Sequence, residues 1–126
     1  MSAVSPMLMY AEPGRAIEFL RDAFGFRVNS VNGDGINAHA FLSLGDSTVS
    51  VWGVWRDAGF ATPVELRGTP SQLWCEVDDV DNHFERARAA GAVVIGPPRD
   101  QDYGFRTYRA IDPEGHRWYF AQATAQ

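Results

Sequence analysis

The sequence contains one half twice, and this repeat limits the possible folds more than any other feature. Residues 7–28, MLMYAEPGRAIEFLRDAFGFRV, have the pattern of a strand, a turn, a helix and a second strand. Residues 72–95, QLWCEVDDVDNHFERARAAGAVVI, repeat that pattern. A glycine, Gly25 or Gly91, stands where each helix should end, as is common just past a helix C-terminus. A chain built from two such halves is expected to fold as two similar modules.

Apolar residues at helical spacing identify the face that each predicted helix should bury. In the first helix they are Ala16, Ile17, Leu20, Ala23 and Phe24, and in the second Val80, Phe84, Ala87 and Ala90. Asp78 or Asp79 is expected to cap the second helix, because a short carboxylate can accept a hydrogen bond from the first free amides. His83 falls outside the apolar stripe, so we expect it near the surface.

Three strand-like segments follow each helix, separated by Gly, Asn, Asp and Pro turns. The segments are 26–32, 37–45 and 47–54 in the first half, and 92–96, 105–111 and 117–122 in the second. We therefore predict an α+β fold of two tandem βαβββ modules, whose curved half-barrel sheets share a concave cavity. Within this single domain, module one should span about 1–55, a linker or lid 56–70, and module two 71–126.

Composition excludes several classes of function. The chain has 126 residues, of which 45% are hydrophobic, and no apolar run approaches the roughly 20 residues needed to cross a bilayer. The net charge of −5 argues against a nucleic-acid partner and mildly favours neutral or cationic ligands. Because the start lacks a secretory signal and Cys75 is alone, we expect a cytoplasmic protein.

Three stretches resemble the vicinal oxygen chelate superfamily. They are IEFLRDAFGF in the first helix, VDDVD…ARAAGA in the second, and DYGFRTYRAIDPEGHRWYFA near the C-terminus. That superfamily includes glyoxalase I, extradiol dioxygenases and the bleomycin-resistance proteins. The resemblance covers nearly the whole chain and implies a homodimer, since members usually build each cavity from modules of two chains. Whether the modules pair within one chain or across two stays open.

The resemblance also identifies four positions where the metal enzymes of the superfamily place His, Glu or Gln ligands. In this sequence they are Ser5, Ser50, Gln72 and Tyr119. Two hydroxyls and a phenol are neutral at pH 7, and a single amide oxygen binds transition metals weakly. No metal or other cofactor is therefore expected.

Strand alternation places other side chains beside these positions. Trp52 shares a face with Ser50, and Trp74 shares one with Gln72. His39 and Phe41 alternate with Ala38, Ala40, Leu42 and Leu44, which are all apolar and should pack against a helix. We therefore expect His39 and Phe41 on the opposite, concave face. The full set of predicted ligand-binding residues is His39, Phe41, Ser50, Trp52, Gln72, Trp74, Arg106, Tyr108 and Tyr119. Aromatic walls with a few convergent polar groups are typical of a small-molecule site.

These residues predict a metal-independent protein that binds a small aromatic molecule, similar to the drug-sequestering bleomycin-resistance proteins. One alternative is a metal-dependent glyoxalase-like lyase or extradiol dioxygenase. A metal-independent isomerase with His39 as its base is a weaker form of that alternative. A third possibility is a structural or regulatory module whose cavity is filled. No catalytic residue is assigned.

Overall fold

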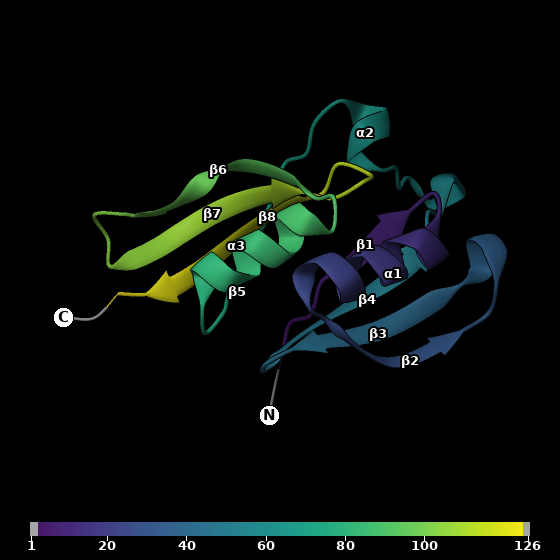
Figure 1. Cartoon of the computed structure of the whole chain (residues 1–126). Coiled ribbons are helices and arrows are strands. Elements are labelled where there is room, and N and C mark those ends of the chain that lie inside the picture. The colour runs from purple at the N-terminus through teal and green to yellow at the C-terminus, as the bar shows by residue number, and fades with distance from the viewer. Residues whose placement is uncertain (1–2, 125–126) are drawn as a thin grey trace.

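The computed structural model of the protein describes residues 3–124 and contains two modules of the same design (Figure 1). The first consists of β1 (Met7–Tyr10), α1 (Pro13–Phe24), β2 (Arg27–Asn32), β3 (His39–Leu44) and β4 (Ser47–Gly53). The second consists of β5 (Leu73–Glu76), α3 (Val80–Ala89), β6 (Val93–Asp100), β7 (Phe105–Ile111) and β8 (Arg117–Ala123). The predicted α+β fold of two tandem βαβββ modules is confirmed, and both sheets are open.

The two sheets have equivalent strand orders, β1-β4-β3-β2 and β5-β8-β7-β6. In each module the first and last strands pair in parallel, which sets Met9 beside Trp52 and Trp74 beside Tyr119. The remaining pairs are antiparallel hairpin neighbours. The pairing therefore brings the start of each module next to its end, with the first strand at one edge of the sheet.

Both helices begin and end close to the predicted residues. Pro13 occupies the first turn of α1, and Gly25 ends that helix with φ of 81°, a left-handed conformation that favours glycine. Of the two acids considered for the second cap, Asp79 is the cap: its side chain accepts a hydrogen bond from the Asn82 amide at 3.0 Å. Ala90, expected on the buried stripe, is instead exposed at the end of α3.

One hydrophobic core joins the two modules. Helices α1 and α3 pack against each other at the centre of the molecule (Figure 1). The Phe24 ring lies edge-on to Trp118 at 5.3 Å and to Phe120 at 4.8 Å, across the boundary between the modules. The helix-covered face of each sheet thus turns inward and its helix-free face turns outward. A single copy therefore leaves both helix-free faces open.

The segment between the modules is folded. It contains the 3-10 helix η2 (Arg56–Ala58) and the short helix α2 (Pro63–Leu66), which is stabilised by a capping box between Thr62 and Glu65. The Val64 amide donates to the Glu114 carbonyl at 3.1 Å, which ties this segment to the 112–116 turn. No helix within residues 3–124 is long and apolar enough to span a membrane.

Candidate functional site

Aromatic side chains form a cluster on the helix-free face of the second sheet. Trp74 stacks on Tyr119 with ring centroids 5.6 Å apart and an interplanar angle of 23°. Phe105 meets Trp74 edge-on at 5.2 Å, and Tyr103 lies 6.5 Å from the same indole. Trp74 remains 45% exposed and Tyr103 52% exposed. Rings this open to water form an apolar surface suited to a ligand or another protein surface.

The helix-free face of the first sheet has a smaller set of the same kind. His39 stacks on Trp52 at 5.0 Å with an interplanar angle of 3°, and Phe41 lies edge-on to Trp52 at 5.9 Å. The Trp52 indole donates to Ser50 Oγ at 2.7 Å. The His39 ring nitrogen Nδ1 lies 3.1 Å from the Asn37 carbonyl, so it already has a partner on its own strand edge.

Strand alternation thus placed seven predicted site residues on helix-free faces, where the structure also has them. They are His39, Phe41, Ser50 and Trp52 on the first sheet and Gln72, Trp74 and Tyr119 at the second. Their role in binding a ligand stays a prediction. Within one chain the two groups lie on different faces, so a single copy does not bring them together.

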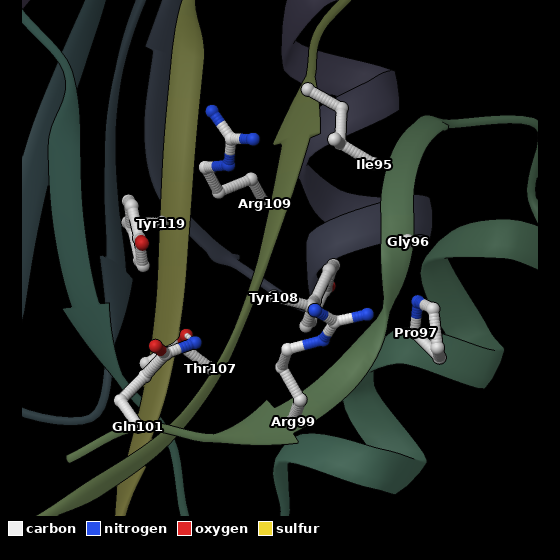
Figure 2. Close-up of a pocket in the computed structure, with 9 residues that line it drawn as sticks. All are labelled: Ile95, Gly96, Pro97, Arg99, Gln101, Thr107, Tyr108, Arg109 and Tyr119. Carbon is white, nitrogen blue, oxygen red and sulfur yellow. Dashed lines mark hydrogen bonds between the residues drawn. The ribbon is translucent and has the colours of Figure 1, made fainter.

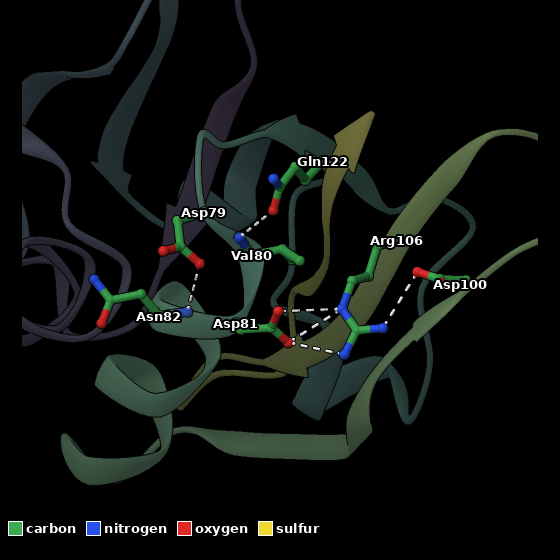
Figure 3. A network of polar contacts seen from close by, with 7 residues as sticks. All are labelled: Asp79, Val80, Asp81, Asn82, Asp100, Arg106 and Gln122. Atoms are coloured by element: carbon green, nitrogen blue, oxygen red, sulfur yellow. Dashed lines mark hydrogen bonds and ion pairs between the residues drawn. The ribbon is translucent and has the colours of Figure 1, made fainter. Parts of the chain in front are cut away.

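Two predicted site residues lie on the opposite face of β7, and their expected orientation was wrong. Arg106 forms ion pairs with Asp81 of α3 at 3.0 Å and with Asp100 at 3.2 Å (Figure 3). Tyr108 is 2% exposed and shares a hydrogen bond of 2.5 Å with the His83 ring. The register explains the difference, because it pairs Tyr108 with Phe120, which packs beneath the helices.

The side chains that β7 does present on the helix-free face are Phe105, Thr107 and Arg109, which alternate with the predicted pair. Strand alternation would have identified these three residues if Arg106 and Tyr108 had been assigned to the helix side of the sheet. Arg109 pairs in register with Tyr119, the ring that stacks on Trp74. The alternation in the sequence therefore separates the two faces of this strand, but it does not show which face is turned toward the helices.

A cavity of about 350 Å³ opens beside this aromatic set, between β6 and β7 (Figure 2). It forms where β6 leaves its register with β7 between Ile95 and Arg99, a break that contains Gly96 at φ of 68°. Its lining residues are Ile95, Gly96, Pro97, Arg99, Gln101, Thr107, Tyr108, Arg109 and Tyr119. Two of the lining side chains bond each other, because the Gln101 amide donates to Thr107 Oγ1 at 3.1 Å. This cavity combines two tyrosine rings with several polar groups.

The four positions that hold the metal in related enzymes do not fit a divalent ion here. Ser5 Oγ donates to the Thr48 carbonyl at 2.8 Å, and Ser50 Oγ accepts the Trp52 indole, so protein groups already occupy both hydroxyls. Gln72 and Tyr119 supply only an amide and a phenol. Among residues 3–124, no cluster of three or more His, Cys, Asp or Glu side chains is arranged to hold a metal.

Two other reactive side chains lie inside the protein. Burial raises the pKa of the Cys75 thiol to about 11, which keeps it protonated and a poor nucleophile at neutral pH. His83, expected near the surface, is half-buried between the modules, where it lies 2.7 Å from the Phe24 carbonyl and 2.5 Å from the Tyr108 hydroxyl. His83 therefore joins α3 to the end of α1.

The chain and its fold match one family of proteins. Residues 4–120 match the model of the Glyoxalase/Bleomycin resistance protein/Dioxygenase superfamily. The chain belongs to this superfamily, as its two βαβββ modules and its 112–116 turn had indicated. Membership defines the fold, while the activity depends on the residues of the site.

Individual relatives agree with this assignment. The chain is 38% identical over 125 residues to the uncharacterized protein Rv0887c of Mycobacterium tuberculosis strain ATCC 25618 / H37Rv, covering 95% of this chain and 74% of that one. It is 34% identical to TioX from Micromonospora sp. ML1, with a TM-score of 0.75 over 97% of this chain and 99% of TioX. The fosfomycin resistance protein FosX from Listeria monocytogenes shares the fold at 16% identity, with a TM-score of 0.71 over 98% of this chain and 94% of FosX.

Proposed function

We propose that this protein binds a small aromatic molecule on its helix-free faces, without a metal ion, and that binding itself is its activity. The observation that carries the proposal is the stacked pair Trp74 and Tyr119, which is open to solvent beside a cavity of about 350 Å³. A planar ligand can extend that stack, and each aromatic contact contributes about 0.5–1.5 kcal/mol beyond the burial of area. The cavity volume lies at the lower end of the range for small-molecule sites.

Sequestration of an aromatic antibiotic is the form of this function that we favour. The superfamily includes bleomycin-resistance proteins. Proteins that protect by binding need a site that covers a ligand and no group that attacks it. The exposed rings satisfy the first condition, and the buried, protonated Cys75 and the partnered His39 are consistent with the second.

The metal-dependent lyase or dioxygenase is the alternative that the side chains support less. Such an enzyme needs an ion held by several imidazole or carboxylate groups, whereas the four equivalent positions offer two serines, a glutamine and a tyrosine. Elemental analysis of the purified protein separates the two functions. A stoichiometric divalent metal would favour the enzyme.

A second copy of the chain is the partner that we infer for the open faces. Large apolar side chains remain exposed on both, with Met7 at 60%, Phe41 at 49% and Trp74 at 45%. Because the two faces of one copy point apart, only a second copy can bring Phe41 and Trp52 opposite Trp74 and Tyr119. Sedimentation at micromolar concentration should give twice the monomer mass of 14.0 kDa. A monomer under those conditions would contradict the shared site.

The binding function is tested by calorimetric titration of the protein with planar aromatic compounds, antibiotics included, in a buffer that contains a chelator. We expect saturable binding that the chelator leaves unchanged. The Trp74→Ala substitution should weaken it about tenfold, in line with the loss of one or two aromatic contacts. Trp55→Ala is the matched control, since Trp55 is 63% exposed and lies outside both aromatic sets. Absence of heat with every compound would refute the proposal.

A further inference from the structure

We infer that the ligand of the second sheet is an aromatic carboxylate, whose acid group binds between Arg99 and Arg109. This inference rests on the proposed function and adds the chemical class of the molecule. It differs from the neutral or cationic ligand that the net charge of −5 suggests. The local potential of a site decides which ligand enters it, so the positions of the positive charges matter more than the net charge.

The positive charges of this protein are all arginines, and most of them are already engaged. Arg15, Arg21, Arg56, Arg88 and Arg106 form ion pairs with carboxylates. Arg86 donates to the Asp22 and Arg21 carbonyls and Arg27 to the Asn29 side chain. Within residues 3–124, four arginines have neither an ion pair nor a side-chain hydrogen bond with the protein: Arg67, Arg99, Arg109 and Arg117. All four are exposed. Arg67 ends α2 in the inter-module segment, whereas Arg99, Arg109 and Arg117 belong to the helix-free face of the second sheet.

Strand register gathers two of these arginines at the cavity. Arg109 of β7 pairs with Ile95 on one side and with Tyr119 on the other, while Arg99 of β6 pairs with Thr107. Arg99 and Arg109 both line the cavity, together with Tyr119 and Gln101 (Figure 2). Two neighbouring strands therefore each contribute one guanidinium group to the lining of the cavity. Two uncompensated cations at one cavity attract an anion more strongly than either would alone.

The groups around the cavity indicate which anion fits. A guanidinium group presents parallel N–H donors that match the two oxygens of a carboxylate or the oxygens of a phosphate. In the row Trp74–Tyr119–Arg109, each residue pairs in register with the next. A flat ring lying against Tyr119 and Trp74 would direct its acid group along this row toward Arg109. The Glu76 carboxylate of this face lies on the opposite edge strand, where it accepts from the Trp74 indole at 3.4 Å.

The test compares three probes of equal ring size: 2-naphthoate, its neutral amide 2-naphthamide, and 2-naphthyl phosphate. Calorimetric titration of the full chain in chelator should show that 2-naphthoate binds at least about tenfold more tightly than the amide, since charge-assisted bonds are roughly twice as strong as neutral ones. The Arg109→Gln and Arg99→Gln variants should each lose most of that difference while binding the amide as before. Arg15→Gln is the control, because Arg15 is exposed on α1 and pairs with Glu12.

The possible results separate the inference from the proposed function. Equal affinity of the wild-type protein for 2-naphthoate and 2-naphthamide would overturn the carboxylate inference and leave aromatic binding intact. Tighter binding of 2-naphthyl phosphate than of 2-naphthoate would keep the anion site and overturn the assignment to carboxylates. No binding of any probe or of the wider aromatic panel would overturn both. Loss of affinity in Arg15→Gln equal to that in Arg109→Gln would show a general effect of charge and would also count against the site.

Discussion

The Tyr10 hydroxyl of the first module donates a 2.5 Å hydrogen bond to the Asp112 carboxylate of the second. Both residues are buried, and Asp112 also accepts from the Trp118 indole at 3.2 Å. Burial and the neighbouring Asp112 raise the pKa of Tyr10 well above its usual value, so the hydroxyl keeps its proton. This bond fixes the first strand of one module against the last turn of the other.

Tyr10→Phe should therefore lower the free energy of unfolding by about 1.5–3 kcal/mol, the range for a buried hydrogen bond to a charged group. Tyr103→Phe is the matched control, since the Tyr103 side chain is 52% exposed. Its effect should stay within about 0.5 kcal/mol. Urea denaturation of the two variants measures both values, and equal effects would contradict the role of the Tyr10–Asp112 bond.

His83 should make stability depend on pH. Burial lowers its pKa, with a smaller contribution from the Arg86 charge, against a raising effect of the bond to Phe24. With a folded pKa below the unfolded value of about 6.5, the unfolded chain takes up a proton first as the pH falls. Stability from neutral His83 is thus complete above about pH 6.5 and is lost as the pH falls from there through the folded pKa.

The measurement is denaturation of the wild type and of His83→Gln between pH 8 and pH 5. The wild type should lose more stability over that interval than the variant, because carboxylates that titrate in both proteins cancel in the comparison. Parallel pH profiles would show that His83 does not contribute. The hydrogen bonds of His83 assign its neutral form with the proton on Nε2. Nε2 must donate, because its partner is the Phe24 carbonyl, and Nδ1 then accepts from the Tyr108 hydroxyl.

The cap of α3 offers a matched pair of adjacent acids. Asp79 accepts from the Asn82 amide (Figure 3). Asp78 precedes Asp79 and makes no cap bond. Asp79→Ala should cost about 1 kcal/mol of stability, the usual value for a lost helix cap. Asp78→Ala should change stability by less than about 0.5 kcal/mol. Thermal denaturation of both variants would contradict the assignment if Asp78→Ala were the more damaging.

Arg106 and Arg109 test the orientation of β7. Arg106 lies on the helix side with Asp81, and its ion pair is largely exposed, so Arg106→Gln should cost no more than about 1 kcal/mol. It should leave the affinity for 2-naphthoate unchanged, in contrast to Arg109→Gln. A loss of affinity in Arg106→Gln that matched the loss in Arg109→Gln would mean that the two faces of β7 had been exchanged.

The sequence predicted the fold because its signals were local. Helix stripes, the two glycines after the helices and the Gly and Asn turns each depend on residues close together in the chain. In 37–45 and 72–77, every second side chain is apolar and was correctly expected to face the helices. The other side chains of these strands were therefore assigned to the correct, helix-free face. In 105–111 both sets mix polar and apolar residues, so Arg106 and Tyr108 were assigned to the wrong side.

Contacts between the modules lay beyond such reasoning. The position of His83 depends on Phe24, 59 residues earlier, and that of Tyr10 on Asp112, 102 residues later. The helix and strand periodicities of the sequence contain no information on contacts between residues this far apart in the chain. The cavity beside Arg109 was missed for a related reason, because it depends on the break in β6 pairing between Ile95 and Arg99. The unpaired arginines became visible only once the partners of the other arginines were known.

The four tryptophans provide the most direct measurement of the central claim, that the helix-free faces bind an aromatic ligand without a metal. Each indole N–H gives its own signal in a proton–nitrogen correlation spectrum, assigned by single Trp→Phe variants. On titration with 2-naphthoate in a chelator, the Trp74 signal should shift strongly. The signals of Trp118, buried in the core, and of Trp55, just before η2, should stay in place. A fixed Trp74 signal at saturation, with shifts at Trp118 or Trp55 instead, would exclude binding on the helix-free face of the second sheet.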